Sequence, residues 1–263
     1  MKQAILVVSF GSSYPETVEN CITATENKIA ASFPDWDVHR SFTSYRIIEK
    51  IKKRDQVHVL KPHEALDQLA DQGYEKVLVQ PLHIMPGYEY EKIERAVVEA
   101  KQNHGDMDIH LGDPLIYANE DYPEVIEVLR NEVIMDDEHH AWVLMGHGTE
   151  HFANAIYSCL QVHMDEQFLP FHVGTVEGYP ELDQVILRLN QNAVHHVTLL
   201  PFMLVAGDHA KNDMASDEED SWKSVLTKAG FQVDCVLKGL GELDGFQEIY
   251  VNRVKRALDS WEA

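Results

Sequence analysis

Short apolar runs that are typical of buried strands alternate with longer helical segments along the whole chain. The first run, "AILVVSF", is followed at once by a segment in which apolar residues recur at helical spacing. Such alternation predicts the α/β class, with parallel sheets covered by helices on both faces. We expect strands to begin near residues 5, 37, 77 and 107, and again near residues 142, 172, 197 and 231.

The second half of the chain repeats the plan of the first. The stretch "ILVVSFGSS" parallels "WVLMGHGTE", which pairs Phe10 with His147. The stretch "VLVQPLHIMPGYE" parallels "VTLLPFMLVAGDH", which pairs Glu89 with His209. Two unrelated βα units can also look alike by chance, because all such units share one pattern.

We favour two similar α/β domains, each a parallel four-stranded sheet flanked by helices, with a cleft between the two domains. Residues 1–136 would form the first domain, and residues 137–263 would form the second, which carries the candidate site. The boundary falls in the acidic stretch "MDDEHH". The last helical segment, "FQEIYVNRVKRALDSW", is expected to pack back on the first domain.

Charge and cysteine usage exclude several classes of protein. The formal net charge of -22 argues against binding to nucleic acid, which needs clustered positive charge, while an acidic surface attracts metal cations. No apolar stretch approaches the roughly 20 residues that span a bilayer, and no cleavage site follows the first apolar run. Three distant cysteines without a CxxC pair suit a reducing compartment. We therefore expect a cytoplasmic protein without membrane or nucleic acid partners.

Three polar residues follow expected strands of the second half: His147, Glu177 and His209. The carboxyl ends of parallel strands form the usual ligand-binding edge of a sheet, so we expect these side chains to converge. Two imidazoles and a carboxylate suit a borderline divalent cation such as Co²⁺, Ni²⁺, Fe²⁺ or Zn²⁺. Gly146 and Gly148 would let the backbone turn sharply and leave room for a flat ligand.

Simpler interpretations of these residues remain open. His147 would then be an ordinary loop residue, and Glu177 would cap the helix expected over "YPELDQVILRL". The chain contains no HExxH, GxxxxGK[ST] or GxSxG motif. It therefore lacks the usual signatures of zinc proteases, P-loop nucleotide hydrolases and serine hydrolases.

Several long stretches make the sequence resemble the anaerobic sirohydrochlorin cobalt chelatases of cobalamin biosynthesis, class II chelatases related in fold to ferrochelatase. They are "LVVSFGSSY", "SFTSYRIIEKI", "LHIMPGYEYEKI", "MGHGTEHFANAIYSCL", "VGTVEGYPELD" and "FMLVAGDHAKNDMASDEEDSWKSVL". The resemblance implies a chelatase-like fold and insertion of Co²⁺ into sirohydrochlorin, a precorrin-2-type tetrapyrrole, without a nucleotide. It also implies that the metal-binding and catalytic residues are His147, Glu177 and His209.

The implied substrate is a polycarboxylate, which conflicts with the acidic net charge and requires local compensation. The backbone N–H groups at Ser12 and Ser13 open a helix and could receive a carboxylate. Arg46 and Lys211 could pair with others, although Arg46 could equally be a solvated helix residue. Glu89 could guide the cation or could be the first-turn acid of its own helix.

Other functions would also use such a site. The nearest alternative is a nickel or iron chelatase that acts on the same tetrapyrrole. A second is a non-catalytic carrier of a metal or tetrapyrrole, and a third is a metal-dependent hydrolase. The sequence leaves open the physiological metal, its source, and whether the chain forms a homo-oligomer.

Overall fold

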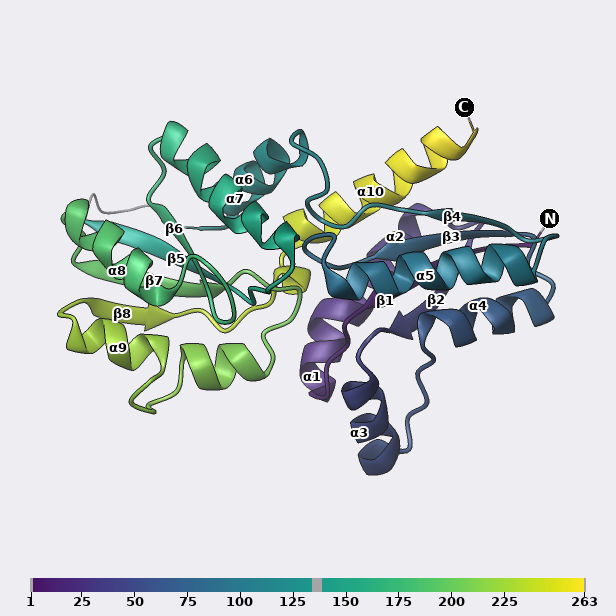
Figure 1. Cartoon of the computed structure of the whole chain (residues 1–263), viewed down its shortest axis with the longest axis horizontal. Coiled ribbons are helices and arrows are strands. Elements are labelled where there is room, and N and C mark those ends of the chain that lie inside the picture. The colour runs from purple at the N-terminus through teal and green to yellow at the C-terminus, as the bar shows by residue number, and fades with distance from the viewer. Residues whose placement is uncertain (1, 134–138, 263) are drawn as a thin grey trace. The chain divides into compact units, whose positions relative to one another are not determined.

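The computed structural model describes residues 2–133 and 139–262 and divides the chain into two compact units (Figure 1). Unit 1 comprises Met1–Tyr117 and Asp244–Ala263, and unit 2 comprises Ala118–Leu243. Each unit contains one parallel four-stranded sheet flanked by helices. This confirms the fold class that the alternating pattern predicts.

The sheet of unit 1 has the strand order β2-β1-β3-β4. Its strands begin within about two residues of the expected positions. The two central strands are nearly continuous apolar runs that are buried along most of their length, whereas the two edge strands contain polar residues and are partly exposed. They are β1 (Gln3–Ser9), β2 (Asp37–Phe42), β3 (Lys76–Pro81) and β4 (Asp108–Leu111).

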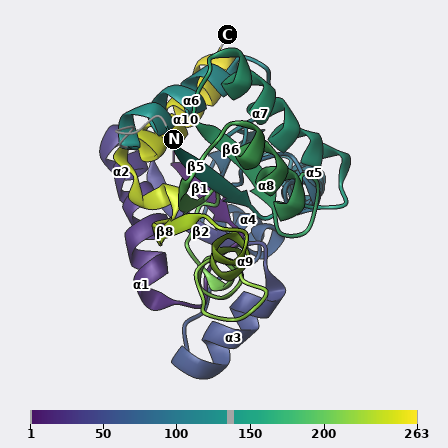
Figure 2. The ribbon, with the colours of Figure 1, turned by 90° about the vertical axis from the view of Figure 1, so that its left-hand side faces the viewer.

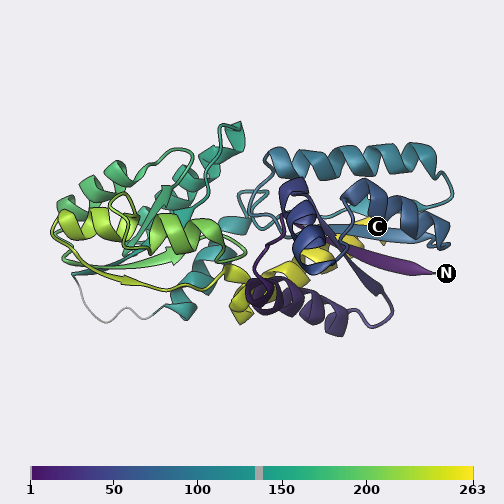
Figure 3. The same cartoon turned by 90° about the horizontal axis from the view of Figure 1, so that it is seen from below.

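Helices cover both faces of this sheet. Residues of α4 and α5 share one buried cluster with Leu6 and Val79. In Figure 3, the blue helix α5 lies on one side of the sheet, and the purple α2 with the yellow α10 lies on the other. The helical elements are α1 (Pro15–Thr17), η1 (Val18–Thr23), α2 (Ala24–Ser32), α3 (Tyr45–Asp55), α4 (Pro62–Asp71), α5 (Tyr88–Asn103) and α10 (Asp244–Glu262).

The sheet of unit 2 repeats this topology, with the order β6-β5-β7-β8. Gly146 at the end of β5 pairs with Thr175 at the end of β6, so the two neighbouring strands end at the same level. The four strands are β5 (His140–Gly146), β6 (Phe171–Thr175), β7 (His196–Pro201) and β8 (Gln232–Cys235).

The helices of unit 2 also divide between the faces of its sheet. Helices α8 and α9 lie on the same side of the sheet in Figure 2, and Val185 and Leu226 pack with Val143 in one buried cluster. The helical elements are α6 (Asp121–Glu132), η2 (Phe152–Asn154), α7 (Ala155–Glu166), α8 (Leu182–Gln191), η3 (Ala210–Met214), α9 (Trp222–Lys228) and η4 (Leu240–Glu242).

The division into units differs from a single cut in the middle of the sequence. The boundary expected at residues 136–137 falls at residues that lie outside the described part of the chain. Helix α6 belongs to unit 2, where the Tyr122 ring stacks on His163 of α7 with centroids 4.8 Å apart. Helix α10 belongs to unit 1, where the Tyr250 hydroxyl donates to the Leu82 carbonyl oxygen at 3.0 Å.

None of the helices in the described ranges combines the length and the apolar character needed to span a bilayer. The three cysteines, Cys21, Cys159 and Cys235, are free thiols.

Candidate metal site

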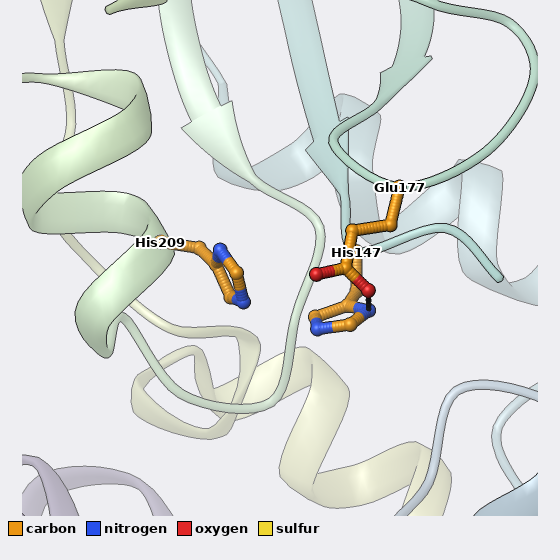
Figure 4. Close-up of side chains that lie close together, drawn as sticks. All are labelled: His147, Glu177 and His209. Carbon is orange, nitrogen blue, oxygen red and sulfur yellow. Dashed lines mark ion pairs between the residues drawn. The ribbon is translucent and has the colours of Figure 1, made fainter.

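Three side chains with metal-binding atoms meet at the carboxyl end of the unit 2 sheet. His147 directly follows β5, Glu177 lies two residues beyond β6, and His209 directly precedes η3. Figure 4 shows the three side chains pointing toward one another. One donor atom from each lies within 4.8 Å of the other two. No other group of three or more His, Cys, Asp or Glu side chains in residues 2–133 and 139–262 is close enough to hold a metal.

The site is open to solvent and close to a binding geometry. The exposed fraction is 44% for the His147 side chain, 59% for Glu177 and 31% for His209. The two imidazole rings are edge-on, with centroids 4.6 Å apart. Ligands about 2.1 Å from one ion lie roughly 3–4 Å from each other, so side-chain movements of about 1 Å would complete the site.

The backbone ladder of the sheet brings His147 and Glu177 together. The pairing of β5 with β6 continues beyond both strands, because the Val176 N–H donates to the Gly146 carbonyl oxygen at 3.1 Å. The Glu177 N–H then donates to the His147 carbonyl oxygen at 2.8 Å. Two donors from different strands are thus fixed side by side by main-chain hydrogen bonds.

The two glycines that flank His147 have a different purpose from the one expected. A Cβ atom on Gly146 would lie 2.3 Å from the Tyr157 ring. Gly148 has φ +80, and a Cβ atom there would lie 2.6 Å from the Gly178 nitrogen. Both positions therefore make room for the chain's own groups, not for a flat ligand. The prediction of a sharp turn holds at Gly148, because only glycine adopts positive φ without strain.

The buried Tyr157 of α7 supports the turn from beneath. Its side chain is 1% exposed, and burial raises the pKa of its hydroxyl to about 12. The backbone of His147 and Gly148 lies beside its oxygen and opposes this rise. Tyr157 is thus a core residue beneath the His147 backbone that the sequence analysis did not identify.

The Asn154 side chain joins the two loops that carry His147 and Glu177. Its Oδ1 accepts from the Thr149 N–H at 3.0 Å, and its Nδ2 donates to the Tyr179 carbonyl oxygen at 2.7 Å. One amide therefore links the segment after β5 to the segment after β6. No sequence spacing signals such a contact, because its partners are backbone groups.

Hydrogen bonds at Nδ1 leave Nε2 of each imidazole to bind a metal. Nδ1 of His147 lies 2.9 Å from the Gly148 carbonyl oxygen, which can only accept, so Nδ1 carries the proton. Nδ1 of His209 lies 2.5 Å from Asp213 Oδ2. A carboxylate behind an imidazole is the usual device that orients a metal-binding histidine. The i, i+4 spacing of His209 and Asp213 was a readable signal that the sequence analysis missed.

The alternative role for Glu177, as a helix cap, does not hold. Helix α8 begins at Leu182, and its N-cap is Glu181. The Glu181 N–H donates to Gln184 Oε1 at 2.9 Å. Glu177 stands four residues before this cap, so its carboxylate is not needed to begin the helix.

The predicted substrate-binding residues lie in unit 1, near the carboxyl end of its own sheet. Ser12 and Ser13 follow β1 and are 4% and 8% exposed. Helix α1 starts at Pro15 with Tyr14 as its N-cap. The Tyr14 N–H already donates to Ser12 Oγ at 3.2 Å.

Arg46 and Glu89 each lie in the first turn of a helix. Arg46 is exposed on α3, which follows β2. Glu89 begins α5 after β3, and its Oε1 pairs with Lys92 Nζ at 2.5 Å. Its Oε2 is buried without a hydrogen-bond partner among the described residues. The expected role of Glu89 as a first-turn acid therefore leaves the burial of Oε2 unexplained.

One further imidazole, His83, follows β3 in unit 1. Burial lowers its pKa to about 4, so it stays neutral at physiological pH. Its Nε2 lies 3.5 Å from Thr43 Oγ1. A cavity of about 500 Å³ elsewhere in unit 1, lined among others by Arg40 and His58, contains none of the predicted site residues.

Comparison with known proteins places the chain in a family. The family model described as cobalt chelatase (CbiK) matches residues 3–259. The chain belongs to the cobalt chelatase (CbiK) family. This confirms the resemblance seen in the sequence motifs.

Two relatives of this cobalt chelatase carry names that state an activity. A protein of Salmonella typhimurium named sirohydrochlorin cobaltochelatase is 45% identical over 98% of this chain and 97% of its own length. Sirohydrochlorin cobaltochelatase CbiKC of Nitratidesulfovibrio vulgaris is 32% identical over 98% of this chain and 92% of its own length. A solved structure of SirB from Bacillus subtilis with Fe³⁺ shares the fold, with a TM-score of 0.68 over 100% of this chain and 98% of that chain at 14% identity.

Proposed function

We propose that this protein inserts Co²⁺ into sirohydrochlorin and that His147, Glu177 and His209 hold the incoming ion. Membership of the cobalt chelatase family and the names of two relatives that match nearly the whole chain support this activity. The observation that carries the assignment of the site is the convergence of the three donors at the carboxyl end of one sheet. Two imidazoles and one carboxylate suit a borderline ion such as Co²⁺.

Insertion exchanges one Co²⁺ for the two protons on the inner nitrogens of the tetrapyrrole. His147 and His209 hold the ion through Nε2, and Glu177 completes its protein ligands. When the ion passes to the ring nitrogens, the freed Glu177 carboxylate accepts one of the two displaced protons, and the other leaves to solvent. A flat ring shields its own nitrogens, so binding energy from the ring periphery is used to bend the ring. No nucleotide enters this scheme.

The substrate carboxylates need donors, and we assign them to unit 1. The backbone at Ser12 and Ser13 and the guanidinium of Arg46 are the candidates near the carboxyl end of that sheet. Glu89, with a buried oxygen that has no hydrogen-bond partner among the described residues, is a candidate for contact with the cation or with a displaced proton. With three free thiols, we expect the protein to work in the cytoplasm.

The activity is tested by mixing the purified protein with sirohydrochlorin and Co²⁺ and following the absorption spectrum of the ring. We expect many turnovers per protein molecule, and a rate that depends on His147. A rate equal to that without protein would contradict the proposal. A spectral change limited to one equivalent of protein would instead identify a carrier.

The identity of the metal is the second question, because the same donors also suit Ni²⁺ and Fe²⁺. Each ion is to be tested alone and in competition at equal free concentration. We expect the highest kcat/KM with Co²⁺. A clear preference for Ni²⁺ or Fe²⁺ would retain the site and the chemistry but change the metal.

A further inference from the structure

Helix α3 carries a charge opposite to that of the rest of the chain. Its 11 residues include five of the chain's 22 Lys and Arg residues but only two acids, Glu49 and Asp55. The whole chain has a formal net charge of -22. A cationic helix on a strongly anionic protein is an exception that requires a cause.

The cations of α3 form a stripe on its outer face. Arg46, Lys50 and Lys53 are four and three residues apart, a spacing that places side chains on one side of a helix. All three are exposed, whereas Ile48 and Ile51 on the opposite side are buried. We call Arg46, Lys50 and Lys53 the basic stripe.

The position of Arg46 opposes the stability of its own helix. A cation in the first turn lies beside the positive end of the helix dipole, and α3 has no acid in that turn. Lys223 occupies the same position in α9, but it pairs with Asp217 at 2.8 Å. Neither Arg46 nor Lys50 lies within 4.0 Å of a carboxylate in the described part of the chain. The stability of α3 therefore does not explain why Arg46 and Lys50 are cationic.

The basic stripe lies near the ligand-binding edge of the unit 1 sheet. Helix α3 starts directly after β2, with Ser44 as its N-cap. Lys50 Nζ lies 5.9 Å from the centre of the Tyr14 ring, and the Arg54 guanidinium donates to the Ser13 carbonyl oxygen at 2.6 Å. These contacts hold α3 against the turn that follows β1, at the carboxyl end of the parallel strands.

We propose that the basic stripe is the docking surface for the carboxylate arms of the tetrapyrrole, with Arg46 and Lys50 as the ion-pairing residues. This inference rests on the proposed function and extends it from one arginine to a surface that controls substrate capture. A polycarboxylate that approaches a protein with net charge -22 is repelled, so local positive charge governs its association rate. The stripe supplies that charge beside the sheet edge.

The test compares the double variant Arg46→Gln/Lys50→Gln with Lys101→Gln/Lys228→Gln. The control removes two exposed lysines from the last turns of α5 and α9. Its net charge therefore equals that of the stripe variant. Two measurements are made on the full chain: steady-state kinetics with Co²⁺, and binding of sirohydrochlorin without metal, followed by fluorescence at several salt concentrations.

We expect the stripe variant to raise KM and the dissociation constant of sirohydrochlorin roughly tenfold with little change in kcat, since two ion pairs are lost. Its binding should also depend less on salt than that of the unaltered protein. The control should match the unaltered protein in both respects. The melting temperature of the stripe variant should not fall, because removal of Arg46 relieves the first turn of α3.

The outcomes separate this inference from the proposed function. If the unaltered protein neither binds nor metalates sirohydrochlorin, the proposed function fails. If it does both, but the stripe variant has the same KM and salt dependence, the docking surface is contradicted. The docking surface would also be contradicted if the stripe variant differed from the unaltered protein only in its oligomeric state in solution, because α3 would then contact another copy of the chain.

Discussion

The two sheets of this protein share one topology but differ in the residues at their carboxyl ends. The strand orders β2-β1-β3-β4 and β6-β5-β7-β8 are equivalent, so β1 and β5 occupy the same position in their sheets. Gly11 after β1 and Gly148 after β5 both adopt positive φ. Where β5 is followed by His147, β1 is followed by Phe10, which is 46% exposed. Where unit 2 has His209, the parallel position in unit 1 is Glu89.

This difference shows that the same fold can place different side chains at the carboxyl end of its sheet, and that these side chains determine what each unit can bind. In the described part of the chain, donors close enough to hold a metal converge in unit 2. Unit 1 has instead two buried serines and a basic helix at the corresponding end. Its composition suits the capture of an anionic ligand, whereas that of unit 2 suits a cation.

Removal of a proposed metal ligand should have the largest effect. His147→Ala should lower the insertion rate by more than about 100-fold, because loss of a ligand exceeds the cost of losing a residue behind one. Phe10→Ala, at the parallel position of unit 1, should leave Co²⁺ affinity unchanged. The rate is measured from the ring spectrum and the affinity by titration with Co²⁺.

The fold of the His147 variant should be retained. The side chain is 44% exposed, so its removal should change the free energy of unfolding by no more than about 0.5 kcal/mol. Rapid turnover by a folded His147→Ala protein would overturn the assignment of the site.

The carboxylate behind His209 should have the next largest effect. Asp213→Ala should weaken Co²⁺ binding by about 10–100-fold, since the imidazole loses the partner that fixes its tautomer. Asp213→Asn, which keeps an oxygen acceptor, should lose less. Lys28→Ala, which removes the partner of Asp244 and Glu248 in unit 1, serves as the control. Equal affinities in all three variants would show that Asp213 does not position the metal ligand.

Each unit also holds an imidazole whose pKa burial lowers to about 4, and that of unit 2, His172, should make the protein sensitive to acid. Burial lowers the pKa of His172 in β6 to about 4, with a further decrease from the charge of Arg188. The unfolded chain binds this proton near pH 6.5, so its contribution to stability is present above pH 6.5 and is lost as the pH falls toward 4. The loss at pH 5 should be about 2 kcal/mol.

His172→Gln should remove this part of the pH dependence. The free energy of unfolding is compared by urea titration at pH 7 and pH 5, and the pKa of His172 is measured by NMR. His83 in unit 1, whose pKa burial also lowers to about 4, provides the comparison. A His172 that titrates near pH 6.5 in the folded protein would contradict the prediction.

The link between the two loops of unit 2 should have the smallest effect. Asn154→Ala removes two hydrogen bonds worth about 1 kcal/mol each, and we expect about a fivefold loss of Co²⁺ affinity. Asn154→Asp keeps the acceptor for the Thr149 N–H but loses the donor to Tyr179. The Co²⁺ affinity of Asn154→Asp should therefore lie between that of the unaltered protein and that of Asn154→Ala. Unchanged affinity in both variants would mean that the ladder bond between Glu177 and His147 suffices.

The sequence predicted the sheets and the convergence of the three proposed metal donors because both depend on local pattern. The central strands β1, β3, β5 and β7 are largely apolar and buried, and they mark the βα repeat from which the starts of all eight strands could be located to within about two residues. The donors could be found because polar residues directly after such runs must gather at one edge of a sheet. His147, Glu177 and His209 follow this rule although they are far apart in the chain.

The residues that the sequence could not reveal act through contacts between distant backbone groups. Tyr157 looks like any apolar helix residue, and Asn154 like any polar one, until the chain is folded. The purpose of Gly146 was wrongly predicted for the same reason, because the ring that fills the space belongs to another element. Helix α6 follows the four strands of unit 1 in sequence, yet it packs with α7 of unit 2, a tertiary preference without a local signal.

The most direct test of the account is a crystal of the protein soaked with Co²⁺ and measured at the cobalt absorption edge. We predict one strong anomalous peak within about 2.0–2.2 Å of Nε2 of His147, Nε2 of His209 and a carboxylate oxygen of Glu177. A fully loaded crystal with its cobalt peak elsewhere, and none among these three side chains, would contradict it.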